Sequence, residues 1–174
     1  MRQAQNALGP KWPDGSADHI TVELHSEGSY SSIVFSITDV PLSTGGNATI
    51  SVPAVFNGLY YITIKHRNSL ETTTSYAISF SGNTITQSFG LSANVYGSNL
   101  GVSLDGHFLI YGGDVNQDGI VDTGDMNDVD NGSTAILFGY NTADANGDGI
   151  VDTSDMNIVD NNSTAIVFVR LPPH

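Results

Sequence analysis

Residues 19–111 alternate between apolar and polar side chains over several short segments, as in Ile20, Val22 and Leu24. Because successive side chains of a strand point to opposite faces, this alternation predicts half-buried β-strands, and no part of the segment has a helical period. Strands are expected at residues 19–25, 32–38, 48–52, 59–66, 75–80, 84–89 and 107–111, with a weaker one at 101–104.

Turn residues separate these segments. Asn57-Gly58 lies between two apolar runs and is a strong hairpin signal, and Gly82-Asn83 is a weaker one. Seven or eight short strands in about 90 residues favour an antiparallel sandwich. We therefore predict a mainly β fold, with an antiparallel immunoglobulin-like β-sandwich over residues 19–112 and a Pro- and Gly-punctuated arm or linker over residues 1–18.

The alternation ends at Gly112, and a repeated sequence begins. Residues 114–138 and 144–168 are identical at 19 of 25 positions when aligned at an offset of 30. A repeat of this size cannot bury its apolar face alone, so residues 113–174 are expected to form a module in which the two copies pack together. The predicted shared core is Ile120, Val121, Met126 and Val129, with Ile150, Val151, Met156 and Val159.

Each copy opens with twelve residues rich in oxygen ligands, DVNQDGIVDTGD at 114–125 and DANGDGIVDTSD at 144–155. Ca²⁺ takes about six to eight oxygen ligands, which a loop supplies from alternate positions and from position 12. Gly119 and Gly149 occupy position 6, where the chain turns sharply. The predicted ligands of two calcium ions are Asp114, Asn116, Asp118, the carbonyl of Ile120, Asp122 and Asp125 in the first loop, and Asp144, Asn146, Asp148, the carbonyl of Ile150, Asp152 and Asp155 in the second.

Asp, Asn and Gly also form surface turns without metal, but a turn has no use for a carboxylate at position 12. The charge distribution favours the metal. From residue 114 onward there are eleven Asp and one Arg, net −10, whereas residues 1–113 carry a net charge of −3. Carboxylates gathered around one point repel one another, so calcium is expected to be a folding partner.

Duplicated loops with Asp at position 12, a helix after each loop and no helix before it resemble the dockerin modules of bacterial extracellular proteins. The resemblance covers roughly residues 112–170. It implies calcium at the residues named above and docking to a cohesin partner. The first helix is expected to end at Gly132 after about two turns, shorter than is typical of a dockerin, and to give way to the run STAILF. Thr123 and Thr153, at position 10, either read a partner as in dockerins or cap their helices.

The composition favours an extracellular protein. There is no Cys, and loops of this kind fill at the millimolar calcium found outside cells. No apolar run approaches the ~20 residues of a membrane span, and the first residues lack the apolar core of a signal peptide. The chain is therefore expected to be a mature form, a fragment, or exported by another route. Its acidic balance, −13 overall, does not favour nucleic acid as a partner.

Catalytic motifs are missing: there is no GxSxG elbow, no Cys nucleophile and no glycine-rich phosphate loop. Glu23 and Glu71 are a conceivable acid–base pair across a sheet. Trp12 and Tyr60-Tyr61 are a conceivable sugar platform, although neighbouring Tyr residues point to opposite faces. The five histidines show no zinc-site spacing.

Several segments admit two readings. Lys65 and Arg67 either dock onto the acidic module or form the solvated end of a strand. Residues 1–18 and the run TAIVFVRLPP at 164–173 either complete a neighbour's sheet by strand addition or are stubs of linkers. N-x-S/T triplets that would mark glycans begin at Asn47, Asn131, Asn161 and Asn162.

These observations favour a non-catalytic, calcium-binding structural or assembly module of a bacterial surface protein or filament. Calcium would rigidify the C-terminal repeats, and terminal strands would mediate association with a protein partner or a second copy. A dockerin-type adaptor that docks to a cohesin-like partner is the alternative, and a carbohydrate-binding module is the third.

Overall fold

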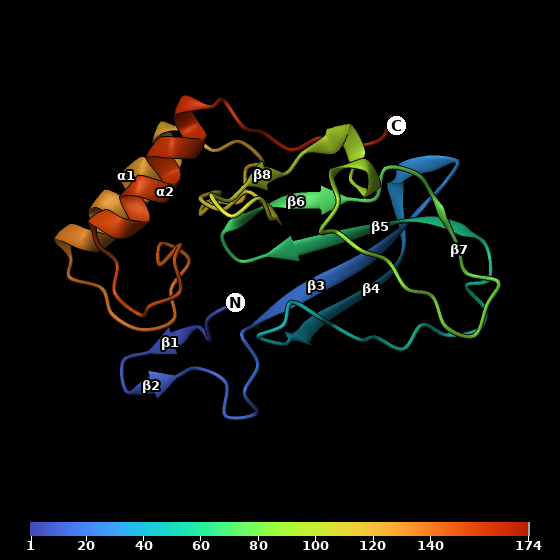
Figure 1. The fold of residues 1–174 in the computed structure, drawn as a ribbon, viewed down its shortest axis with the longest axis horizontal. Coiled ribbons are helices and arrows are strands. Elements are labelled where there is room, and N and C mark those ends of the chain that lie inside the picture. The colour runs from blue at the N-terminus through green and yellow to red at the C-terminus, as the bar shows by residue number, and fades with distance from the viewer. Residues whose placement is uncertain (174) are drawn as a thin grey trace.

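A long antiparallel hairpin forms the centre of the computed structural model, which describes residues 1–173 (Figure 1). Strand β3 (Asp18–Ser26) pairs with β4 (Ser29–Leu42) on one side and with β5 (Leu59–His66) on the other. The strands predicted at 19–25, 32–38 and 59–66 are thereby confirmed, because each lies within one of these three elements.

Strand β5 also pairs with β6 (Ser69–Thr73) and with the short β7 (Ile78–Ser79), which gives a five-stranded sheet. Two antiparallel ribbons stand apart from this sheet. They are formed by β1 (Gln5–Asn6) with β2 (Gly9–Pro10), and by β8 (Gly101–Val102) with β9 (Phe108–Leu109). Two short 3₁₀ turns, Ser92–Asn94 and Tyr96–Ser98, precede β8. The predicted mainly β, antiparallel character is confirmed.

One face of the sheet is apolar. Ile20, Val22 and Leu24 of β3 form a buried cluster with residues of β4 and β5, and irregular chain covers it, including Ile50 and Phe89. The strands predicted at 48–52 and 84–89 are wrong, because these segments bury apolar side chains against the sheet without pairing as strands. Only the residues of β7, β8 and β9 are strands within the segments predicted at 75–80, 101–104 and 107–111. Within residues 1–173, the sheets other than this five-stranded one are two-stranded ribbons.

The hairpin predicted at Asn57-Gly58 does not form. The preceding chain is a turn, closed by a hydrogen bond from Phe56 N to the carbonyl of Pro53 at 3.0 Å. The tight turn instead lies at Arg67-Asn68, between β5 and β6, where His66 pairs with Ser69. This dipeptide lacks the Gly that is typical of two-residue hairpin turns, so the sequence does not predict a turn here.

Each repeat contributes one twelve-residue helix, α1 (Thr123–Thr134) or α2 (Thr153–Thr164). The expected helix end at Gly132 is wrong, because the chain stays helical through Thr134. Beyond the helix, Leu137 N donates to the carbonyl of Gly132 at 3.0 Å and Ile136 N to that of Ser133 at 3.0 Å. These bonds satisfy the last carbonyls of the helix and require a left-handed residue, which is Ile136 at φ 53°.

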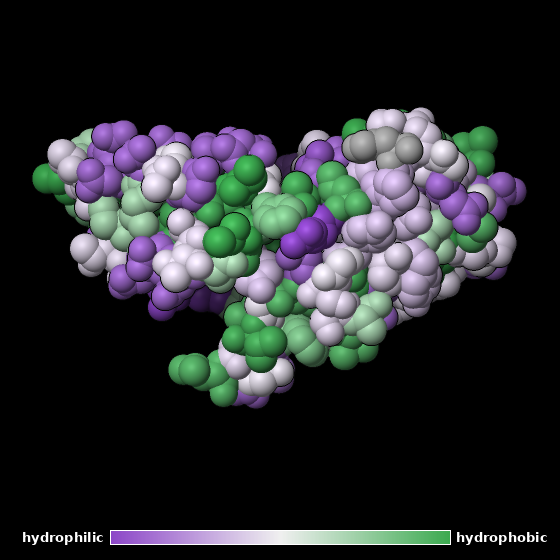
Figure 2. All heavy atoms as spheres, turned by 90° about the horizontal axis from the view of Figure 1, so that it is seen from above, coloured by the Kyte–Doolittle hydropathy of each residue, from purple (hydrophilic) through white to green (hydrophobic). Residues whose placement is uncertain are grey.

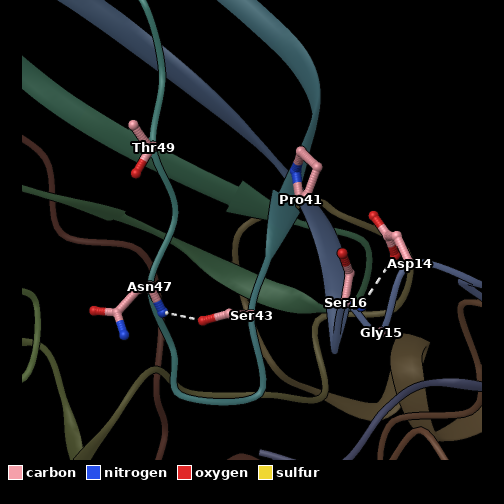
Figure 3. A pocket seen from close by; sticks show the side chains of 7 residues that line it. All are labelled: Asp14, Gly15, Ser16, Pro41, Ser43, Asn47 and Thr49. Carbon is pink, nitrogen blue, oxygen red and sulfur yellow. Dashed lines mark hydrogen bonds between the residues drawn. The ribbon is translucent and has the colours of Figure 1, made fainter.

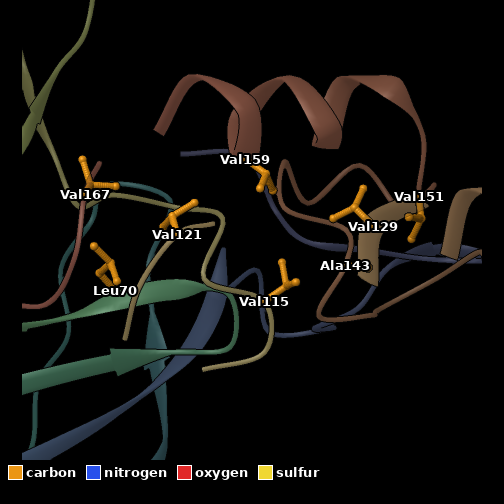
Figure 4. Packing of buried hydrophobic residues seen from close by; sticks show 8 residues of the cluster. All are labelled: Leu70, Val115, Val121, Val129, Ala143, Val151, Val159 and Val167. Atoms are coloured by element: carbon orange, nitrogen blue, oxygen red, sulfur yellow. The ribbon is translucent and has the colours of Figure 1, made fainter. Parts of the chain in front are cut away.

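The two repeats share a core with the sheet (Figure 4). Val121, Val129, Val151 and Val159 are buried as predicted, and Met126 and Met156 pack against them. Ile120 and Ile150 are exposed, contrary to prediction, because they pair through their backbones with Phe168 and Phe138. The residues of this core that the repeat pattern missed are Leu70, Val115, Ala143 and Val167. Leu70 belongs to β6, so the sheet and the repeats bury apolar surface together.

The chain that follows each helix crosses to the loop of the other repeat. Val151 N donates to the carbonyl of Leu137 at 3.1 Å, and Val121 N donates to that of Val167 at 3.1 Å. The β-branched run after each helix is therefore used to join the repeats.

Seen from above, the helix end of the molecule is covered mainly by hydrophilic side chains with small apolar patches among them (Figure 2). Within residues 1–173, no helix has the length and apolarity needed to cross a membrane.

Candidate metal centre

Residues 114–125, called loop 1 below, fold around their own polar side chains. Asn116 Oδ1 accepts from Asp118 N at 2.8 Å, and Asp118 Oδ1 accepts from Ile120 N at 3.0 Å. The carboxylate of Asp125 accepts from Val115 N at 2.8 Å and from Asp122 N at 2.9 Å. The side chains at positions 3, 5 and 12 therefore shape the loop by bonding its backbone amides.

Residues 144–155, called loop 2, repeat this arrangement. Asn146 Oδ1 accepts from Asp148 N at 2.8 Å, and Asp148 Oδ1 from Ile150 N at 3.0 Å. Asp155 accepts from Asn146 N at 2.9 Å and from Asp152 N at 3.0 Å. The same residue types at the same spacing thus build the same geometry twice, and both position-12 carboxylates are completely buried.

The residue at position 9 joins each loop to its helix. Asp122 and Asp152 are the N-caps of α1 and α2 and accept from Gly124 N at 2.6 Å and Ser154 N at 2.7 Å. The capping role considered for Thr123 and Thr153 is therefore wrong, because a carboxylate one position earlier fills it. Both Thr side chains are exposed.

Position 1 of loop 1 carries a buried oxygen that lacks a bond. Asp114 is 2% exposed, and within residues 1–173 its Oδ1 has no hydrogen-bond partner. Burial, and next the charge of Asp125, raise the pKa of Asp114 to about 6. Burial likewise raises the pKa of Asp144 and of Asp155. A cation held within each loop would offset the cost of burying these charges, so the oxygen donors of each loop fit a hard divalent metal.

In the described chain, however, no three His, Cys, Asp or Glu side chains converge as a metal-holding group. The loop carboxylates turn toward backbone amides, and the predicted set also draws on an Asn side chain and a carbonyl in each loop. The sequence-predicted residues are therefore brought to two compact loops, with Asp114, Asp125, Asp144 and Asp155 buried and Asn116 and Asp118 exposed.

The sheet contributes residues to loop 2 that the loop motif does not contain. Arg67 Nη1 donates to the carbonyls of Asn141 and Asp144, and Arg67 Nε donates to Asp18 Oδ2 at 3.2 Å. Asn68 Nδ2 donates to the carbonyl of Asp144 at 2.8 Å. Of the two readings of Arg67, docking onto the acidic module is confirmed. In the sequence, only the surplus of acidic residues in the repeats indicated this contact.

Lys65 forms its ion pairs on the sheet and not with the repeats. Its Nζ bridges Glu23 at 3.0 Å and Glu71 at 3.3 Å on the sheet, and Glu71 accepts from the hydroxyl of Tyr30 at 2.8 Å. The two Glu side chains considered as an acid–base pair thus share one ammonium. A pocket of about 300 Å³ lies beside this ion pair and is also lined by Asp114 and Asp118 of loop 1.

A second pocket, of about 340 Å³, lies at the base of β4 (Figure 3). Its lining residues are small and mostly polar, from Asp14 and Ser16 to Asn47 and Thr49, and the hydrogen bonds between them are local, such as that from Asn47 N to Ser43 Oγ at 3.0 Å. Nothing in this lining offers convergent chemistry.

Trp12, His25 and His66 contact other groups of the protein. Trp12 stacks on His19 with ring centroids 3.5 Å apart, so this face of its ring is not open to a sugar. His25 Nδ1 donates to the carbonyl of Tyr30 at 2.6 Å, and His66 lies 3.0 Å from Asp18. His174 lies outside the described residues.

Both terminal segments lie on the loops. Gln5 N donates to the carbonyl of Gly147 in loop 2 at 3.1 Å, and Val169 N donates to that of Gly119 in loop 1 at 2.8 Å. Strand addition to a second molecule would need free backbone groups in the arm and in the run at 164–173. Some of these groups are already bonded to the loops of the same chain. Among the glycan triplets, Asn47, Asn131 and Asn161 are exposed, whereas Asn162 donates to the carbonyl of Gly112 at 2.7 Å.

No protein-family model, curated protein or solved structure matches this chain.

Proposed function

We propose that the protein is a non-catalytic, calcium-binding structural module, with one Ca²⁺ in each loop. The observation that carries this proposal is the duplicated loop geometry, in which oxygen side chains recur at positions 1, 3, 5, 9 and 12 and the carboxylates at positions 1 and 12 of each loop are buried. The unpartnered Oδ1 of Asp114 supports it, because a buried carboxylate oxygen without a donor is costly.

Calcium would act in this proposal by neutralising the carboxylates that the fold gathers. The loops would hold it through the residues predicted from the sequence. If each site had a dissociation constant near ~10⁻⁵ M in about 1 mM calcium, binding would stabilise the fold by roughly 2.7 kcal/mol per site. Such affinities suit the calcium concentration outside cells. We therefore propose that the module belongs to a bacterial surface protein or extracellular assembly.

We also propose that the repeats are dockerin-like and that the sheet domain is immunoglobulin-like. The position of each helix directly after its loop supports the dockerin-like assignment. The antiparallel sheet, whose apolar face is covered by further chain, supports the immunoglobulin-like assignment. Each post-helical segment bonds to the loop of the other repeat, and this supports a structural role because the two repeats are tied together.

Calorimetric titration of calcium into the chelator-treated chain tests the proposal. Two sites are expected, and Asp118→Ala or Asp148→Ala should each abolish one. Asp128→Ala is the matched control, because this exposed residue lies on α1 outside the loop. Fewer than two sites in the unmodified chain would refute two calcium loops.

A second candidate is the adaptor that docks a separate partner, and a specific observation favours it. Ile136 and Ile166 are 67% and 75% exposed at equivalent positions and both adopt the left-handed backbone conformation. A β-branched residue is strained there, and strained residues cluster at functional sites such as ligand clamps. Tight capture of a cohesin-like protein, lost in an Ile136→Asp, Ile166→Asp double variant, would favour the adaptor.

A further inference from the structure

The two loops are braced differently although their ligand residues are nearly the same. In loop 2, Arg67 Nη1 donates to the carbonyl of Asp144 at 2.9 Å and also to that of Asn141. Asn68 Nδ2 donates to the carbonyl of Asp144 at 2.8 Å and to that of Thr142 at 3.2 Å. The β5–β6 turn thus holds the entry to loop 2 with a guanidinium and a buried amide, and bonds from charged donors are the stronger kind.

The carboxylate at position 1 of loop 2 is also satisfied. Asp144 Oδ1 accepts from Gly147 N at 2.9 Å and from Asp148 N at 3.0 Å, and Oδ2 accepts from Gly149 N at 3.0 Å. The N-terminal arm adds the bond from Gln5 N to the carbonyl of Gly147. Loop 2 is therefore closed by hydrogen bonds that need no ion.

Loop 1 is also bonded by a terminal segment, through Val169 N and the carbonyl of Gly119 at 2.8 Å, but it has no counterpart of the Arg67 and Asn68 side-chain bonds. The carbonyl of Asp114 accepts at 2.6 Å from the amide of Gln117, which is a neutral and exposed side chain of the loop itself. Gln117 adopts φ 61°, where loop 2 has Gly147, so loop 1 carries backbone strain that loop 2 avoids. Oδ1 of Asp114 is buried and has no hydrogen-bond partner among residues 1–173, whereas both carboxylate oxygens of Asp144 accept hydrogen bonds.

We propose that Arg67 is a brace that keeps loop 2 closed when calcium leaves, so that calcium removal opens loop 1 alone. Loop 1 is then the calcium-responsive half of the module. This inference rests on the calcium binding proposed above. Arginine suits the task because its planar guanidinium contacts two carbonyls and the carboxylate of Asp18 at once, which a lysine ammonium does not.

Hydrogen–deuterium exchange of the full chain, in millimolar calcium and in EDTA, tests the inference through peptides from the two loops. In EDTA, loop 1 amides should exchange at least about ten-fold faster than in calcium, and loop 2 amides less than about two-fold faster. Arg67→Gln should make loop 2 respond as well, by about ten- to a hundred-fold, the range expected for the loss of a charge-assisted hydrogen bond. Lys65→Gln, which removes a cation two residues away, should leave loop 2 unchanged.

The comparison of the two loops in the unmodified chain does not depend on any variant folding. Asn68→Ala provides a second variant, expected to shift loop 2 in the same direction as Arg67→Gln. An equal response of both loops to EDTA overturns the inference and leaves calcium binding intact. If exchange in neither loop responds to calcium and calorimetry detects no bound ion, the proposed function fails and the inference with it.

Discussion

The hydroxyl of Tyr140 donates a hydrogen bond to Oδ1 of Asp18 across 2.7 Å and thereby joins the first strand of the sheet to the segment that leads into loop 2. The same carboxylate lies 3.0 Å from His66 and accepts from Arg67 Nε at 3.2 Å. Arg67 in turn lies over the ring of Tyr140, with its guanidinium carbon 4.6 Å from the centroid. Asp18 is therefore the residue at which sheet, turn and repeats are tied together.

Replacing Asp18 by Ala should lower the free energy of unfolding by about 3–5 kcal/mol, because the largely buried guanidinium of Arg67 would lose its carboxylate partner. Asp39→Asn is the matched control: Asp39 pairs with His19 at 2.5 Å but is exposed, so the expected loss is below about 1 kcal/mol. Urea denaturation measures both. A loss as small as that of the control in Asp18→Ala would contradict the role of Asp18.

The ionisation of Asp18 should also make the stability of the fold depend on pH in strong acid. Burial alone would raise its pKa, but hydrogen bonds from His66 and Tyr140 outweigh it and hold the pKa well below its usual range. The stabilisation from its ionised form is fully present above the unfolded pKa of about 4 and is lost as the pH falls toward the folded pKa. The stabilities of the unmodified chain and of Asp18→Asn, measured by urea denaturation, should converge progressively as the pH falls below about 4. A constant difference across this range would be inconsistent with the shift.

Near neutrality, the sign of the pH response should depend on calcium. The folded pKa of Asp114 is raised to about 6, so without calcium the folded chain gains stability as the pH falls through this value. With calcium bound, the carboxylates stay ionised and acid competes with the ion, so the same change should destabilise. Thermal melts at about pH 7 and about pH 5, in EDTA and in millimolar calcium, measure the reversal. A shift of the same sign in both buffers would argue against it.

Glycine should stabilise the helix ends. Ile136 and Ile166 both have φ 53°, which costs an L-residue roughly 1–2 kcal/mol and a glycine nearly nothing. Ile136→Gly and Ile166→Gly should each raise the free energy of unfolding by about 1 kcal/mol, after the entropy cost of glycine. Ala135→Gly, at the right-handed residue next to it, should lower the free energy by about 0.5–1 kcal/mol. Stabilisation by Ala135→Gly, or destabilisation by Ile136→Gly, would contradict the claim that the left-handed backbone at residue 136 is strained.

Deleting residues 1–10 should weaken calcium binding at loop 2. The deletion removes the buried side chain of Ala4 and the bond from Gln5 N to the carbonyl of Gly147. Leu8→Ala, at the fully exposed tip of the β1–β2 ribbon, should have no effect. Calorimetry and thermal melts measure both. A deletion that leaves calcium affinity and stability unchanged while abolishing self-association would support strand donation by the arm.

The sequence alone determined the parts of this protein that depend on local spacing. The alternation at 19–25, 32–38 and 59–66 found the three long strands, because period two reports one buried face. The twelve-residue motif located both loops and the start of both helices, because its side chains bond backbone amides that lie no more than 10 residues away.

Long-range contact decided the rest. The segments at 48–52 and 84–89 carry a strand's alternation but have no neighbouring strand to pair with, and pairing is a property of the whole sheet. Ile120 and Ile150 read as core residues, yet their outward positions follow from backbone pairing with Phe168 and Phe138, which the repeat cannot show. The reach of Arg67 to loop 2 depends on a turn 74 residues from Asn141, so it follows from the way the sheet and the repeats pack on each other and from no pattern in the chain.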